Sequence, residues 1–217
     1  MYKNAPIFSS YSFSDKLLDE VFDKKGNVSE IFKIKSTKKN RTYPIKTLYY
    51  NNSDNLLFIG TENKGIIVYD VKLKKIRPNI ISKPLRALLK NSIINDIKKD
   101  AKNNLIIGAT GLGLIRYNCE TQKIRQFYRN KIASNIMKSI FIDANDEIIA
   151  GGIGGVSTIK IDEKGVAKIK NYFKNRPLIT YNVSAVFKDS NNVIWIGTTT
   201  RGLYKITGNE TKIVNFP

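Results

Sequence analysis

The sequence contains few side chains that could perform covalent or acid–base chemistry. It has no histidine and one cysteine, Cys119, so neither a Ser-His-Asp nor a Cys-His nucleophile system can form. The same shortage excludes a zinc site of the Cys/His type within the chain and a histidine that carries a phosphoryl group. Adjacent carboxylates such as Asp162-Glu163 flank turns, whereas a glycosidase needs two that face each other. We predict no catalytic residue, no metal site and no cofactor.

Arginine and tyrosine side chains are better candidates for binding a ligand. Arginine offers a fixed fork of donors for carboxylate, sulfate or phosphate groups, and tyrosine could stack on a sugar ring. The predicted ligand-binding residues all lie in segments that connect apolar runs: Arg86, Arg129, Arg176, Tyr181 and Arg201. They can form one site only if those segments meet on one face of the fold, which depends on the elements that carry them.

The charge of the chain is strongly basic. Its formal net charge is +19, from 37 Lys and Arg against 18 Asp and Glu. Most of the basic residues are lysines spread along the chain beside abundant Asn and Ile, whereas nucleic-acid binders cluster Arg and Lys on one face. We therefore predict no specific nucleic-acid partner, and a surface that favours an acidic small ligand.

A repeated pattern of apolar runs and glycines identifies the elements. Each copy has an apolar run that ends in glycine and is followed by a second glycine, at Gly65, Gly113, Gly155 and Gly202. These second glycines are 48, 42 and 47 residues apart, and propeller blades repeat at about 40–50 residues. An Asp- or Asn-rich turn precedes the glycine-ending run, as at Asp189-Ser190-Asn191-Asn192, and such residues form hairpin connections.

Each copy contains four short runs of strand type joined by turns, which is the plan of a propeller blade. The predicted fold is therefore all-β, a β-propeller of about four complete four-stranded blades. The predicted blades cover approximately residues 45–80, 92–129, 135–174 and 182–217. In this topology the turn between the second and third strands shares a face with the connection to the next blade. The five candidate residues therefore all belong to one predicted binding face.

The residues before the first blade do not form a complete repeat. After an N-terminal segment at 1–16, residues 17–44 are predicted as a half blade of two outer strands followed by a linker, because Phe22-Asp23-Lys24-Lys25-Gly26 matches Ile161-Asp162-Glu163-Lys164-Gly165. A short helix over Asp15–Phe22, capped by Ser14, is the alternative. An open array leaves apolar faces at both ends. We therefore expect a partial propeller, which belongs to a longer one or closes by self-association or with another chain.

The last repeat resembles a known family. The run Asp189-x-x-Asn192-Val193-Ile194-Trp195-Ile196-Gly197-Thr198, followed by Arg201-Gly202-Leu203-Tyr204, is similar to the two-component-regulator propeller repeat. The resemblance covers residues 45–217 in four copies, and Phe58, Ile106 and Ile149 stand where the fourth copy has Trp195. It implies the sensor portion of a hybrid two-component histidine kinase, of the kind found in Bacteroidetes-type bacteria.

The expected function follows from that resemblance. It implies signal transduction by a periplasmic propeller that detects an oligosaccharide or another small polar ligand, alongside other blades or domains of the same sensor. The segment Met1 to Ser14 does not have the pattern of a secretory signal, so a cytoplasmic location is the alternative, and no apolar run is long enough for a membrane segment. A protein-interaction scaffold is the alternative function, and a carbohydrate-active hydrolase or lyase propeller is a third.

Overall fold

The computed structural model describes residues 43–173, 182–208 and 210–214, together with three short strands that precede them. These three strands are β1 (Ser12–Phe13), β2 (Leu18–Asp19) and β3 (Lys33–Ile34). β1 pairs with the start of β4, and β2 pairs antiparallel with β3. The half blade predicted at 17–44 lies mostly outside the described residues, as does the alternative helix, so both stay predictions.

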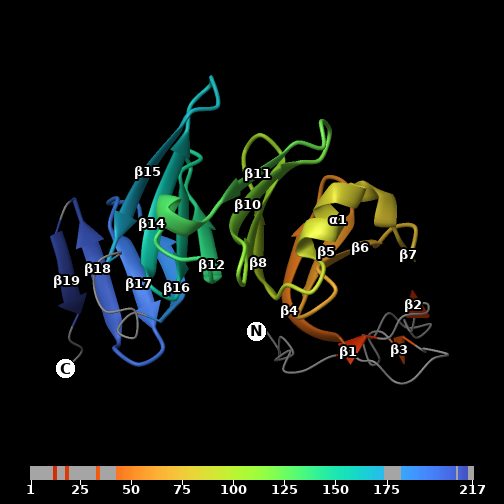
Figure 1. Ribbon diagram of the computed structural model, residues 1–217, viewed down its shortest axis with the longest axis horizontal. Helices are drawn as coiled ribbons and strands as arrows, with labels where there is room; N and C mark the ends of the chain where they lie inside the picture. The colour runs from red at the N-terminus through yellow and green to blue at the C-terminus, as the bar shows by residue number, and fades with distance from the viewer. Residues whose placement is uncertain are drawn as a thin grey trace, which may run out of the picture.

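The described strands from β4 onward form four antiparallel sheets, one for each sequence repeat, and these do not close into a ring (Figure 1). Blade 1 contains β4 (Tyr43–Asn51), β5 (Leu56–Thr61), β6 (Ile66–Asp70) and β7 (Lys75–Ile76). Blade 2 contains β8 (Ile94–Lys99), β9 (Asn104–Ala109), β10 (Gly113–Asn118) and β11 (Ile124–Phe127). Blade 3 contains β12 (Met137–Ile142), β13 (Ile148–Gly152), β14 (Gly155–Ile161) and β15 (Ala167–Tyr172). Blade 4 contains β16 (Val183–Lys188), β17 (Ile194–Thr198), β18 (Leu203–Thr207) and β19 (Glu210–Val214). The prediction of an all-β partial propeller is confirmed.

The blades pack face to face through their apolar second strands. Every residue of β9 is buried, and Ile106 on this strand belongs to the apolar cluster shared with blade 3. Ile149, at the same position of blade 3, packs in the cluster shared with blade 4. A fully buried isoleucine contributes about 1.5–3 kcal/mol, so the contacts between blades are a main source of stability.

One connection between blades contains helices that the sequence reasoning treated as a loop. Between β7 and β8 the chain forms a 3-10 turn, η1 (Pro78–Ile80), and a short helix, α1 (Lys83–Leu89). The helix begins after Ser82, whose Oγ accepts a hydrogen bond from the backbone N–H of Leu85 at 3.4 Å, and such a cap satisfies one of the free N–H groups of the first turn. Leu85 and Leu89 point into the cluster between blades 1 and 2, and this burial favours a helix there. A second 3-10 turn, η2 (Arg129–Lys131), follows β11.

Carboxylates organise the turns between the first and second strands of blades 2, 3 and 4. The Oδ1 atom of Asp100 accepts hydrogen bonds from the backbone N–H groups two and four residues later, at 3.0 and 2.7 Å. Asp143 and Asp189 make the same pair of bonds in their turns. In these turns the residue three positions after the aspartate has a positive φ, as at Asn103 and Asn192, a conformation that Asn tolerates.

Hydrogen bonds also connect the first strands of neighbouring blades. Each first strand carries a register shift, after which Asp96 faces Gly108 in blade 2 and Ser139 faces Gly151 in blade 3. Asp96 Oδ2 accepts a bond from the N–H of Ile140 at 2.7 Å, across the blade boundary. Ser139 Oγ accepts the equivalent bond from blade 4 at 3.1 Å. Throughout the described ranges, no helix has the length and hydrophobicity of a membrane-spanning segment.

Candidate ligand-binding sites on the loop face and between the blades

The connections between blades lie on the same face as the turns between second and third strands. Gly113 N, at the end of such a turn, donates to the carbonyl of Asn135 in the connection to blade 3 at 3.0 Å. Gln126 Nε2 donates to the Leu112 carbonyl in the same turn at 2.9 Å. A Cβ on Gly65 would touch Leu89 of α1. We call this side of the array the loop face.

The predicted ligand-binding residues are only partly placed by the structure. Arg86 lies on α1, and its Nη1 donates to the carbonyl of Pro78 at 3.0 Å, so it fastens its own connection. Arg201 is exposed in the blade 4 turn, where its N–H donates to Thr198 Oγ1 at 3.0 Å. Blades 2 and 3 lie between these two arginines. Arg129 begins η2, and nothing of its side chain is described, while Arg176 and Tyr181 lie outside the described residues. The loop-face site therefore stays a prediction.

Two grooves lie between neighbouring blades on the side opposite the loop face. One, of about 410 Å³, separates blades 1 and 2, and the other, of about 400 Å³, separates blades 3 and 4. Both are lined by residues near the turns between first and second strands and between third and fourth strands, such as Asp54 and Gln122 in one and Asn192 and Gly208 in the other. Sequence reasoning missed both grooves because it placed binding residues only on the loop face.

The groove between blades 1 and 2 has balanced charges. Arg77 Nη1 lies 2.9 Å from Asp70 Oδ2, and Lys99 Nζ lies 3.5 Å from Asp54 Oδ2 across the blade boundary. Burial raises the pKa of the Cys119 thiol, which also lines this groove. A thiol with a raised pKa is a poor nucleophile at neutral pH, so this groove offers neither net charge nor reactive chemistry.

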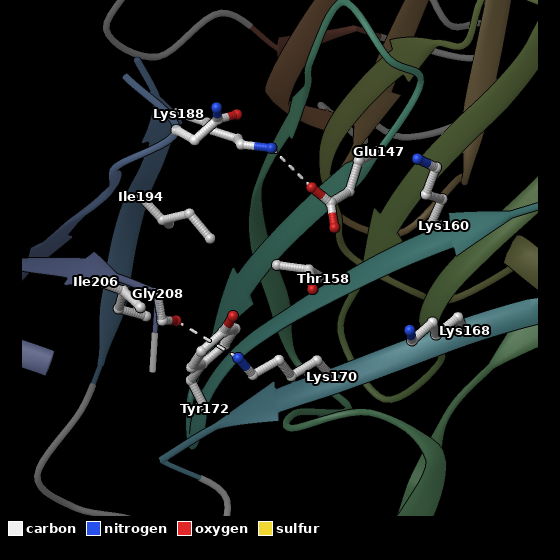
Figure 2. A pocket seen from close by; sticks show the side chains of 11 residues that line it. Glu147, Thr158, Lys160, Lys168, Lys170, Tyr172, Lys188, Ile194, Ile206 and Gly208 are labelled. Carbon is white, nitrogen blue, oxygen red and sulfur yellow. Dashed lines mark hydrogen bonds and ion pairs between the residues drawn. The ribbon is translucent and has the colours of Figure 1, made fainter. Parts of the chain in front are cut away.

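The groove between blades 3 and 4 is strongly basic. Among the described residues that line it, Glu147 is the one acidic residue. The described lining also contains four lysines: Lys160, Lys168, Lys170 and Lys188. Figure 2 shows Lys160 on β14, and Lys168 and Lys170 on β15. Lys188 extends from blade 4 to Glu147. We call it the lysine groove. Tyr172 forms part of one wall, and Ile194 and Ile206 form an apolar part of the other.

Lys188 joins the two blades at one side of this groove. Its Nζ lies 2.7 Å from Asp143 Oδ2 and 2.8 Å from Glu147 Oε2, both on blade 3. Burial opposes ionisation of Asp143, but hydrogen bonds from Lys188 and from backbone N–H groups outweigh it, so the pKa of that carboxyl is lowered. Burial likewise opposes the charge of Lys188, and its two carboxylate partners still raise its pKa. The pair is therefore ionised at neutral pH.

The turn aspartates use their second oxygen differently in each blade. In blade 4, Trp195 Nε1 donates to Asp189 Oδ2 at 2.8 Å, and this bond is the main reason that the pKa of Asp189 is lowered. Where isoleucine replaces that tryptophan, another donor takes its place. Arg116 Nε donates to Asp100 in blade 2 at 2.8 Å, and Lys188 donates to the blade 3 aspartate. Blades 2 and 3, which lack the tryptophan, thus keep a hydrogen bond to the turn aspartate through a different residue.

A metal centre would need several ligating side chains close together. In the ranges that the structure covers, no three His, Cys, Asp or Glu side chains come together in a way that could bind a metal ion. The sequence contains no histidine. What both grooves and the loop face offer is hydrogen bonding, charge and apolar contact, which are the means of recognition.

Comparisons with known proteins agree with this architecture. A family model described as two component regulator propeller matches residues 177–200. The chain is 28% identical over 163 residues to histidine kinase P4 of Formosa agariphila, an overlap that covers 71% of this chain and 12% of that protein. The chain thus spans about an eighth of the kinase's length.

Solved structures share the fold at low sequence identity. The extracellular domain of a hybrid two-component system from B. thetaiotaomicron is 20% identical, with a TM-score of 0.64 over 85% of this chain and 24% of that one. PorZ, a surface component of the type-IX secretion system of Porphyromonas gingivalis, is 13% identical, with a TM-score of 0.60 over 89% of this chain and 30% of that one. Virginiamycin B lyase from Staphylococcus aureus is 16% identical, with a TM-score of 0.59 over 90% of this chain and 62% of that one. These matches show that the chain folds as blades of a β-propeller and that residues 177–200 match the two component regulator propeller repeat.

Proposed function

We propose that this chain is a ligand-recognition propeller segment of a bacterial two-component sensor, which acts by binding and not by catalysis. The observation that carries the proposal is the regulator repeat at 177–200, in a chain that is 28% identical to a histidine kinase over 71% of its own length. The structural relatives from B. thetaiotaomicron are described as extracellular domains. We propose the same side of the membrane for this chain, in the periplasm or outside the cell.

The blade boundaries suggest how binding could produce a signal. Neighbouring blades are joined by apolar packing and by a few polar contacts, such as those of Lys188. A ligand seated between two blades would contact both and favour one spacing of them over others, and a ligand changes a conformational equilibrium only through such differential contacts. We propose a small polar ligand, with a carbohydrate as the leading class.

A protein-interaction scaffold is the second candidate function, and a partly exposed aromatic pair at the boundary of blades 3 and 4 favours it. Phe187 is 51% exposed, and its ring centre lies 5.0 Å from that of Phe141 in blade 3. Exposed aromatic residues of this kind mark protein interaction sites.

A lyase is less well supported, although the fold is shared with one. A related structure of the Staphylococcus aureus lyase is described as catalytically inactive because alanine replaces a histidine, and this chain has no histidine. That catalytic group therefore has no counterpart here.

The test is a binding screen of the complete chain by thermal unfolding. The panel contains neutral and acidic oligosaccharides, with the corresponding monosaccharides as controls. A ligand at about 100 times its Kd stabilises a protein by roughly 2.7 kcal/mol, which raises the Tm of a protein of this size by about 5–10 °C. We expect at least one oligosaccharide to produce such a shift. If none does, and the chain instead captures a protein in a stable complex, the scaffold function replaces ours.

A further inference from the structure

One position in the blades differs in charge from its counterparts in the other repeats. The fifth residue of the third strand, counted from the one that faces the glycine of the second strand, is paired with a lysine of the fourth strand in blades 1, 2 and 3. Asp70 faces Lys75 in blade 1, and the N–H of Asn118 bonds to the carbonyl of Lys123 in blade 2. In blade 3 this position holds Lys160, directly opposite Lys168. An attractive or neutral pair has thus become a repulsive one.

The two facing lysines place two positive charges on neighbouring strands. Directly opposed residues have Cβ atoms about 4.5–5.5 Å apart, and like charges in that position are destabilising. No described carboxylate lies within ion-pair distance of Lys160 or Lys168. Glu147, the acidic residue in the groove, is bound by Lys188. An anion placed between the two lysines would therefore relieve repulsion that the fold itself leaves in place.

A second substitution opens the space in front of this pair. In blade 2 the long side chain of Arg116 extends from the third strand to Asp100. Thr158 stands at the same position of blade 3, since it faces Lys170 as Arg116 faces Arg125. The shorter threonine does not fill the space that an arginine takes, and it lines the lysine groove.

The rest of the groove suits a sugar chain more than a simple inorganic ion. Lys168, Lys170 and Tyr172 alternate along one face of β15, so successive side chains stand about 7 Å apart. The Nζ of Lys170 lies 4.9 Å from the centre of the Tyr172 ring. Arg125 lies at the same distance over Phe127 in blade 2, so the stacking is a feature of the repeat, and the tyrosine hydroxyl is what blade 3 adds. Aromatic and apolar walls beside a row of cations can hold a ring that carries negative groups.

We propose that the lysine groove between blades 3 and 4 binds an acidic oligosaccharide, with one carboxylate or sulfate held jointly by Lys160 and Lys168 and a neighbouring one by Lys170. This inference rests on the proposed function and specifies its ligand class and its site. It places the ligand on the side opposite the loop face.

The test is isothermal titration of the complete chain with three probes: a galacturonic acid hexamer, a sulfated hexasaccharide, and a neutral maltohexaose. Lys160→Asn and Lys160→Asp introduce the residues that blades 2 and 1 have at this position, so both side chains are compatible with the blade fold. Lys72→Gln, an exposed lysine in a blade 1 turn, is the control for the loss of one positive charge. Urea unfolding of each variant without ligand measures stability separately.

We expect wild type to bind at least one acidic probe tenfold or more tightly than maltohexaose. Lys160→Asn should weaken that binding about tenfold, and Lys160→Asp more, while both raise the urea midpoint because they remove a like-charge pair. Lys72→Gln should change neither property. Equal affinity for acidic and neutral probes would overturn the acidic class while leaving the sensor proposal intact, and unchanged acidic binding in Lys160→Asp would overturn the site. If no saccharide of either kind binds, the lysine-groove proposal is wrong, while the sensor proposal is decided by the thermal screen of the broader panel.

Discussion

Asp100 links the first turn of blade 2 to its third strand, and its replacement is expected to destabilise the protein strongly. The carboxylate is 2% exposed and accepts bonds from the N–H groups of Lys102 and Asn104, while its other oxygen bonds Arg116 at 2.8 Å. In Asp100→Ala the buried Asn104 loses its acceptor, at about 1–3 kcal/mol for an unsatisfied buried group. Arg116, which is 20% exposed, loses its counter-ion; breaking a buried pair costs about 3–5 kcal/mol. Because this arginine can reach water, its share lies below that range, and the total comes to about 4 kcal/mol.

The assay is urea unfolding followed by far-UV circular dichroism. With a slope of about 2 kcal/mol/M, the Asp100→Ala midpoint should fall by about 2 M. Asp100→Asn keeps one oxygen for the turn and loses the charge, so its midpoint should lie between those of wild type and Asp100→Ala. Asp162→Ala removes a similar turn bond at an exposed position and should have a much smaller effect. The fluorescence of Trp195 in blade 4 reports whether the damage spreads beyond the neighbouring blades. A midpoint for Asp100→Ala no lower than that of Asp162→Ala would refute the reasoning.

Three further predictions concern pH and backbone space. Lys188→Met should lower the urea midpoint at neutral pH, because the hydrogen bond from Lys188 helps lower the pKa of the Asp143 carboxyl. Stability that comes from a lowered carboxyl pKa is lost as pH falls through the folded-state pKa, so the midpoint of this variant should decrease less in acid than that of wild type. Burial raises the pKa of the Asp96 carboxyl, so the folded state keeps that carboxyl protonated to a higher pH than the unfolded state does. The free energy of unfolding therefore declines as pH rises between the unfolded-state and folded-state pKa values. Asp96→Ser should keep the hydrogen bond to the next blade and abolish that decline in urea midpoints measured from acid to neutral pH. A Cβ on Gly152 would lie 1.9 Å from a backbone oxygen, whereas one on Gly111 would meet nothing within 4 Å. In thermal unfolding, Gly152→Ala should therefore lower the free energy of unfolding by about 3 kcal/mol. Gly111→Ala should lower it by about 1 kcal/mol, because of the positive φ alone.

The repeat made the fold predictable, and the helix shows where that reasoning stopped. Apolar runs ending in glycine at a period of 42–48 residues allow only a few architectures. The segment that forms α1 lies between repeats, so the repeat pattern predicts a loop there. Its signals were present: Ser82 as a cap, Pro84 in the first turn, and Leu85 and Leu89 four residues apart. Seven residues are too few for a helix to be stable by propensity alone, so the deciding contribution is burial between blades.

The site was harder to predict because it depends on register. Lys160 and Lys168 are unremarkable in a lysine-rich sequence, and they oppose each other only because the intervening turn sets that pairing. A slip of one residue would send the side chains of β15 to the other face. The alternation of Lys168, Lys170 and Tyr172 was visible, but the blade that it faces was not. The loop-face arginines, by contrast, were chosen from topology alone, and topology fixes which side of the array a segment occupies without fixing its neighbours.

The bonds between inner strands give the row of blades a direction. Asp96 supplies an acceptor to blade 3 and Ser139 supplies one to blade 4, whereas the same position in blade 4 is Ala185, whose side chain can accept nothing. A tandem duplication of the gene segment for blade 2 or blade 3 would thus yield a unit already equipped to hold its successor. A duplicated blade 4 would first need a polar residue at this position. We therefore expect related proteins with additional blades to have gained them by duplication of blade 2 or blade 3.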